Sequence, residues 1–220
     1  MRVSTLKCEA KKLSTKIIII SDTHGLHEDV LIPDGDVLIH AGDFTAKGAL
    51  SDVEVFNHFL GRLPHRHKIV IAGNHEHCFE RTPHEARALL TNAIYLQDEC
   101  VTIEGVSYYG SPWQPWFFDW AFNLKRGAAL KAKWDSIPEE TDVLITHGPP
   151  AGVADVTAGG LSVGCEDLLN RVALVKPTLH AFGHIHEGYG VKHSESTTFV
   201  NASICDFEYA PVNPAIEFVL

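Results

Sequence analysis

The chain has 220 residues, of which 45% are hydrophobic and 21% are charged, as in an ordinary globular protein rather than a disordered or fibrous one. It contains no apolar run near the roughly 20 residues that cross a bilayer. The apolar run 17–20 near the N-terminus is too short for the core of a signal peptide. We therefore expect a cytoplasmic protein without membrane association, with one domain over residues 16–220 preceded by a basic segment, residues 1–15.

The net charge is −10, and its distribution argues against nucleic-acid binding. Residues 1–16 hold five basic residues and one acidic residue, so the rest of the chain is more acidic than the total suggests. An acidic body repels long polyanions. We expect no stable complex with nucleic acid, and a protein that is a monomer or a homodimer.

In the first half of the chain, short apolar runs alternate with amphipathic stretches. Residues 16–20, 36–40 and 68–72 are continuous apolar runs bounded by Gly, Asp or Asn, which is typical of buried strands. Residues 51–63 place large apolar side chains at helical spacing, and a second helix is expected from Pro83. Each helix is preceded by a Ser or Thr with Glu three residues later, which predicts a capping box.

The second half continues this alternation. Residues 99–109 have the pattern of a hairpin with a Glu-Gly turn, and a helix is expected over 126–137. A strand at 142–146, a helix at 166–175 and a strand at 178–182 follow. Strands are also predicted at 197–204 and 215–220. Alternating strands and helices with a strand-rich end predict stacked sheets covered by helices.

Short polar clusters follow the predicted strands. In open α/β sheets, ligands bind beyond the carboxyl ends of strands, where neighbouring loops meet. We therefore expect the side chains of these clusters to form one site. The clusters are Ser21-Asp22-Thr23-His24, Ala41-Gly42-Asp43, Gly73-Asn74-His75-Glu76, Thr146-His147-Gly148 and Gly183-His184-Ile185-His186.

The residue types in the clusters indicate a metal centre. Carboxylate, amide and imidazole groups without thiolates suit Mn²⁺, Fe, Zn²⁺ or Co²⁺ and disfavour Cu(I) and iron–sulfur clusters. Seven metal-competent groups are too many for one ion and suit two ions that share a carboxylate. We expect two divalent ions, with Mn²⁺ the most active.

The motifs D-x-H, G-D, G-N-H-E, T-H-G and G-H-x-H, in this order, resemble those of the calcineurin-like metallophosphoesterases. The resemblance runs from Ile17 to the C-terminus, and longer stretches such as 110–116 and 146–150 look like the small MPPED-type (metallophosphoesterase domain-containing) branch. It implies an α/β fold, the four-layer α/β/β/α metallophosphoesterase sandwich, as a single domain. It also implies hydrolysis of a phosphoester by a metal-bridging hydroxide.

The resemblance also implies a role for each matching residue. Asp43 would bridge the two ions, and His75 would be the catalytic histidine that protonates the leaving group. One ion would be held by Asp22, His24 and His186, and the other by Asn74, His147 and His184. Some relatives in this branch have Gly at the position of His184, so the histidine here favours a complete second site.

One departure from the family pattern concerns the substrate. Protein phosphatases of the superfamily follow their G-D motif with a stretch that ends in Asp-Arg-Gly, whereas this chain has Ala46 and Lys47 at those positions. Lysine can bind a phosphate as a point charge but cannot make the bidentate contact of arginine. Lys47 is thus a candidate substrate-binding residue, and its presence argues against a protein-phosphatase function.

The aromatic segment 113–120 contains three tryptophans and two phenylalanines. Core packing is the ordinary explanation for such a segment. The alternative is that Trp113 or Trp116 lines the pocket and stacks on a nucleobase.

We expect a metal-dependent phosphodiesterase that acts on small, cyclic nucleotide-like phosphodiesters. A phosphomonoesterase or a nuclease at the same site is the alternative, although the acidic body disfavours a nuclease. A scaffold or binding protein that kept this fold without catalysis would have lost ligand residues, and every ligand position is filled here.

Overall fold

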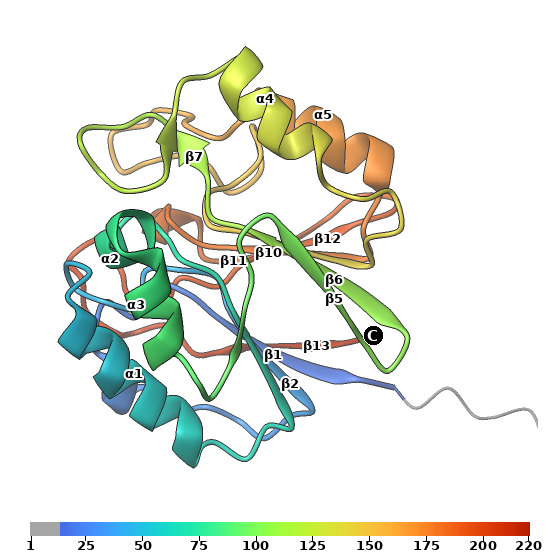
Figure 1. The fold of residues 1–220 in the computed structure, drawn as a ribbon. Helices are drawn as coiled ribbons and strands as arrows, with labels where there is room; N and C mark the ends of the chain where they lie inside the picture. Colours follow the sequence, from blue (N-terminus) through green and yellow to red (C-terminus); the bar gives the residue numbers. More distant parts are fainter. Residues whose placement is uncertain (1–13) are drawn as a thin grey trace, which may run out of the picture.

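The structure is a computed structural model that describes residues 14–220; the first thirteen residues, which form most of the expected basic segment, lie outside the described part. Two β-sheets pack face to face, and helices cover the outer face of each sheet (Figure 1). The fold is therefore the expected four-layer α/β/β/α sandwich. None of the helices in residues 14–220 combines the length and apolar composition that a membrane crossing requires.

The first sheet has five strands in the order β13-β1-β2-β3-β4. Four of them run parallel and carry their carboxyl ends to one edge, while β13 runs antiparallel to β1. Their bounds are Lys16–Ile20 for β1, Val37–His40 for β2, His67–Val70 for β3, Ile94–Tyr95 for β4 and Ile216–Val219 for β13.

The second sheet has six strands in the order β11-β12-β10-β9-β6-β5, of which the central four are parallel. The predicted hairpin is present, with Ile103 paired with Val106 across the turn. The strands are β5 (Glu99–Ile103), β6 (Val106–Ser111), β9 (Val143–Thr146), β10 (Leu179–Phe182), β11 (Gly190–His193) and β12 (Thr198–Asn201), and a separate pair is formed by β7 (Gln114–Pro115) and β8 (Asn123–Leu124).

Helices close the sandwich on both sides (Figure 1). Three of them cover the first sheet: α1 (Leu50–Arg62), α2 (His77–Arg81) and α3 (Pro83–Leu89). Two cover the second sheet: α4 (Ala128–Asp135) and α5 (Glu166–Val175). Two short 3₁₀ turns, η1 (His27–Asp29) and η2 (His186–Gly188), follow β1 and β10.

The run of four isoleucines in β1 shows how the sequence specifies these layers. Successive side chains of a strand point to opposite faces. Ile17 and Ile19 accordingly pack between the two sheets, while Ile18 and Ile20 pack under α1–α3. All four are fully buried, so each of these four positions needs an apolar residue.

The predicted capping boxes are absent. Helix α1 begins at Leu50, one residue before the expected cap, and Ala49 offers it no side-chain acceptor. Thr82 does stand at the N-cap of α3, but its hydroxyl donates to the carbonyl of Cys78 in the preceding helix instead (3.2 Å). The short α2 ends so close to α3 that its last turn takes the hydroxyl that a capping box would use.

The two sheets meet at the edge where their parallel strands end. Ser21, just after β1, forms a parallel bridge with Ser203, just after β12. The Ser21 amide donates to Ala202 (2.9 Å), and the Ile204 amide donates to the Ser21 carbonyl (2.8 Å). Loops from both sheets therefore converge on one place.

Candidate metal centre

The loops after β1, β2, β3, β9 and β10 carry all seven predicted metal ligands to this shared edge. Four of these residues, Asp22, His24, Asp43 and His184, have left-handed backbone with φ between 46° and 70°. Residues other than glycine avoid this conformation, which persists only where the surrounding structure imposes it. The sharp turns at the strand ends aim these side chains back into the centre.

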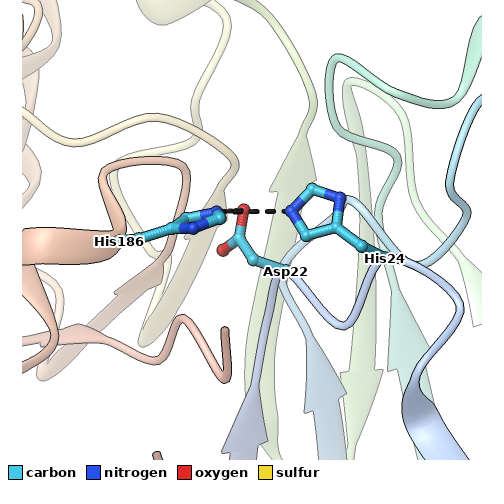
Figure 2. A group of neighbouring side chains, drawn as sticks. All are labelled: Asp22, His24 and His186. Carbon is cyan, nitrogen blue, oxygen red and sulfur yellow. Dashed lines mark hydrogen bonds and ion pairs between the residues drawn. The ribbon is translucent and has the colours of Figure 1, made fainter. Parts of the chain in front are cut away.

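One group consists of Asp22, His24 and His186, whose donor atoms all lie within 4.8 Å of one another. The imidazoles of His24 and His186 point toward each other, and the carboxylate of Asp22 points toward the same place (Figure 2). His186 Nε2 is 3.3 Å from His24 Nε2 and 3.6 Å from Asp22 Oδ1. Ser203 and the amide of His184 donate to Asp22 and fix its orientation.

The second group centres on Asp43. Its Oδ1 accepts the amide of His75 (2.8 Å), and its Oδ2 lies 3.3 Å from His147 Nε2. Asn74 Oδ1 lies 2.9 Å from the same His147 nitrogen, and the ring of His184 is 4.9 Å from the ring of His147. Asp43 also groups with His24 and His75, so this carboxylate lies between the two clusters.

The outward-facing nitrogens of the imidazoles fit a metal centre. His147 Nδ1 donates to the carbonyl of Ala41 (3.0 Å), and His186 Nδ1 donates to the carbonyl of Asp206 (2.8 Å). These bonds leave each Nε2 lone pair directed inward, towards other acceptors. A cation bound at this place can be shared by the inward Nε2 atoms and the carboxylates, and such backbone partners are typical of metal-binding histidines. The side chains therefore fit divalent ions.

Charges in this buried centre shift several pKa values. Burial opposes ionisation of Asp22 and Asp43, but the neighbouring imidazoles outweigh it and hold the pKa of each carboxyl below its usual value. Burial also disfavours the imidazolium of His147, yet Asp43 raises its pKa to about 9. For His184, burial and the neighbouring His147 lower the pKa to about 3. The chain thus concentrates negative charge on two carboxylates that need cations.

Glu76 has a role that its sequence position did not reveal. It is fully buried and accepts the amides of Asp43 (2.8 Å), Thr45 (2.9 Å) and Gly73 (2.6 Å), together with the hydroxyl of Thr45 (2.8 Å). Burial and the neighbouring Asp43 raise the pKa of Glu76 to about 7. This carboxylate fastens the loop after β2 to the loop after β3.

His75 lies at the rim of the centre. Its Nδ1 donates to the carbonyl of Ala46 (2.6 Å), which leaves Nε2 free and 3.8 Å from Asp43 Oδ2. Its ring stacks on Trp120, with centroids 4.4 Å apart and planes inclined by 23°. The carbonyl of Ala46 thus orients His75. Ala46 belongs to the stretch after the G-D motif, where the sequence differs from the pattern of the protein phosphatases.

A cavity of about 430 Å³ opens over the centre. The aromatic segment is not the core element that its composition suggested, because Trp116 is 59% exposed and lines this cavity together with Phe117 and Trp120. Trp113 does not line it: its ring packs on Phe122 and its Nε1 donates to Asp98. Lys47 is exposed and also lies outside the lining.

The lining also includes residues that the motifs gave no reason to select. Tyr209 lies beside His24, with ring centroids 4.8 Å apart, and Phe207 precedes it on the same loop. Arg126 and Thr157 come from the loops that lead to α4 and α5. None of these positions directly follows a strand that the sequence predicts, so a search along predicted strand ends could not find them.

The chain is similar to known proteins over most of its length. The calcineurin-like phosphoesterase family model matches residues 15–188. Metallophosphoesterase domain-containing protein 1 of Homo sapiens is 50% identical over 227 residues, which cover 92% of this chain and 70% of that protein. The UPF0046 protein T07D4.2 of Caenorhabditis elegans is 40% identical over 94% of this chain and 60% of that protein.

A solved crystal structure shares the fold, with a TM-score of 0.67 at 17% identity, and the match covers 89% of this chain and 92% of the other. The chain belongs to the calcineurin-like phosphoesterase family and is a metal-dependent phosphoesterase. Within that family, its relatives place it in the metallophosphoesterase domain-containing branch.

Proposed function

We propose that the protein is a phosphodiesterase with two metal ions. The observation that carries the proposal is the convergence of carboxylate, amide and imidazole groups on two adjacent clusters that share Asp43. We assign Asp22, His24 and His186 to one ion, Asn74, His147 and His184 to the other, and Asp43 to both. Mn²⁺ is our choice for activity, since oxygen and nitrogen ligands without thiolates suit it.

Two divalent ions would supply a water of lowered pKa and neutralise charge on the phosphoryl oxygens. The chain supplies the remaining chemistry. The departing alkoxide needs a proton, and His75 can give one from Nε2 because Ala46 holds its other nitrogen. Glu76 and the amide of His75 hold Asp43 in place, so the shared carboxylate does not rotate during the reaction.

We propose small phosphodiesters, of the cyclic nucleotide type, as substrates. A cavity of about 430 Å³ suits a small molecule. Its aromatic wall offers Trp116 and Trp120 to a flat group. The net charge of −10 opposes the approach of a long polyanion.

The test compares bis-p-nitrophenyl phosphate with p-nitrophenyl phosphate in the presence of Mn²⁺, Zn²⁺, Co²⁺ or Fe²⁺. We expect faster hydrolysis of the diester and close to two bound ions per chain by metal analysis. Faster hydrolysis of the monoester would replace the diesterase by a phosphomonoesterase. Less than one bound ion together with no metal-stimulated activity would contradict the proposal as a whole.

Two substitutions separate the proposed roles. Asp43→Ala should remove both bound metal and activity, because both clusters use that carboxylate. His75→Ala should keep the metal and lower kcat by about 10²- to 10⁴-fold for alkyl esters, which are poor leaving groups. The loss should be much smaller for nitrophenyl esters, whose leaving group needs no proton. Equal losses for the two kinds of ester would remove His75 from the proton transfer.

A further inference from the structure

The wall of the cavity holds a fixed cation. Among the described residues that line the cavity, Arg126 is the one arginine or lysine. It comes from the loop before α4, whereas the metal centre comes from the strand ends. The proposed phosphoester chemistry does not use it.

Three acceptors hold this guanidinium in place. Nη1 donates to the carbonyl of Gly164 (2.7 Å) and to the carboxylate of Glu166 (2.5 Å), and Nη2 donates to the carbonyl of Val163 (2.7 Å). A guanidinium has five N–H donors. The Nε–H and one Nη2–H thus have no hydrogen-bond partner within residues 14–220.

The neighbouring groups leave room for an anion. Val163 lines the cavity next to Arg126, so the loop that fixes the guanidinium also forms the wall. The partner carboxylate, Glu166, is 69% exposed, and water weakens its pairing with Arg126. Glu187, the acidic lining residue outside the metal centre, accepts the amide of Ala158 and makes no ion pair with Arg126.

We infer that Arg126 binds a second oxyanion of the substrate, a carboxylate or a second phosphate, at the cavity wall outside the metal centre. This inference rests on the proposed function, because it takes the phosphoryl group to bind at the metal centre. An oxyanion can accept from the two free N–H groups, and such charge-assisted bonds are the ones for which arginine is suited. Arg126 is thus a specificity-determining residue that distinguishes an anionic ester group from a neutral one.

The test measures affinity rather than turnover. Calorimetry on the Mn²⁺-loaded protein compares phenylphosphonate with analogues that carry a para-carboxylate or a second para-phosphonate, each with a phenyl or a longer benzyl tail. These phosphonates are not hydrolysed. A failure to hydrolyse any phosphoester would therefore contradict the proposed function and leave these affinities interpretable.

We expect the better of the anionic tails to tighten binding by about five- to tenfold in the unsubstituted protein. Arg126→Gln should reduce that ratio to about 1 without changing the affinity for phenylphosphonate. Arg126→Lys should keep part of it, since the charge remains. Which anionic tail gives the larger gain identifies a carboxylate or a phosphate as the natural group.

Glu166→Gln is the matched control, because it removes the competing carboxylate and should raise the ratio. If Arg126 only ties the loops before α4 and α5 together, Arg126→Gln will lower the melting temperature or weaken all ligands equally and leave the ratio unchanged. That result would overturn the inference. So would a ratio of 1 in the unsubstituted protein for both anionic groups and both tail lengths.

Discussion

Left-handed backbone at Asp22, His24, Asp43 and His184 shows how far the chain departs from relaxed geometry at its metal centre. Each such position costs on the order of 1–3 kcal/mol and persists because the surroundings impose it. Hydrogen bonds from Ser203 and from the amide of His184 to Asp22 are part of that constraint. Bound cations would offset the remainder, since they relieve the repulsion among the buried carboxylates.

Gly183 is the residue where the approach of two loops is closest. A Cβ there would lie 1.9 Å from Asp22 Oδ2 and 2.2 Å from Ser21 Oγ, so any other side chain must displace the carboxylate. We predict that Gly183→Ala lowers kcat/KM on the order of 100-fold, as expected when a ligand moves by about 1 Å. Steady-state kinetics with metal analysis would check this.

Gly148→Ala is the matched control, because a Cβ there would meet nothing closer than 3.7 Å. It also stands next to a proposed ligand but should leave activity within about twofold of the unsubstituted enzyme. Similar losses in both variants would mean that general loop rigidity, rather than the approach to Asp22, governs the effect.

Glu76→Gln tests the carboxylate that joins two ligand loops. A glutamine can keep only one acceptor oxygen, so its amide would face backbone N–H groups of Asp43 and Gly73 or of Thr45. Each donor left unsatisfied costs about 1–3 kcal/mol. We predict lower stability in denaturant unfolding together with weaker metal binding, whereas Glu85→Gln on the exposed face of α3 should change neither.

Sequence predicted the residues of the metal centre better than the residues that support them. Proposed ligands such as Asp22 and His147 directly follow apolar strands, and that position is visible in the sequence. Glu76 acts on Asp43 across 33 residues, and Trp120 stacks on His75 from another loop. Such contacts form only when the loops have come together, so no local sequence pattern predicts them.

At the scale of elements, β10 carries a buried histidine where an apolar residue would be expected. His180 Nε2 donates to the hydroxyl of Thr146 (2.8 Å), which in turn donates to the carbonyl of Gly148 (2.8 Å). Its Nδ1 is buried without a hydrogen-bond partner. Burial lowers the pKa of His180 to about 3, so the folded protein keeps this ring neutral.

That depressed pKa predicts acid sensitivity. Below about pH 6.5 an unfolded histidine gains a proton that folded His180 refuses until about pH 3. Stability from this group is therefore complete above pH 6.5 and falls as pH drops, by up to ~1.4 kcal/mol per pH unit. His180→Gln should flatten the curve between pH 6.5 and 5 in urea unfolding with excess chelator. The exposed substitution His58→Gln should leave the slope unchanged.

Long elements were predictable and short ones were not. The strand 16–20 and the helix 166–175 have the bounds that their patterns indicate. Helix α2, with five residues, and strands β4, β7 and β8, with two residues each, are too short to show a period. Tertiary contacts define these elements, and β7 with β8 shapes the wall that bears Trp116.

For the whole molecule, metal removal should have a large effect on stability. An ion present at about 100 times its Kd stabilises the folded state by about 2.7 kcal/mol. In a chain of 220 residues this corresponds to roughly 5–10 °C in melting temperature for each ion. Calorimetric melting with Mn²⁺ and with chelator would measure the difference. Asp43→Ala should melt at the same temperature in both conditions.

The four-layer arrangement was anticipated from the family resemblance together with the alternation of strands and helices. The alternation alone indicates stacked sheets but does not say how the two sheets meet. The bridge between Ser21 and Ser203 joins residues far apart in the sequence, and no pattern near either serine indicates it.

Because loops from both sheets meet at this bridge, the metal centre is complete only when both sheets have formed. Asp22, Asp43 and Asn74 come from the first sheet, whereas His147, His184 and His186 come from the second. Under the proposed assignment, each ion would bind side chains from both sheets and so cross-link them. A chain made only as far as β4 would hold Asp22, His24 and Asp43 for one ion and Asn74 and Asp43 for the other, so neither set would be complete. Under this assignment, tight metal binding would require that both sheets have formed and packed together.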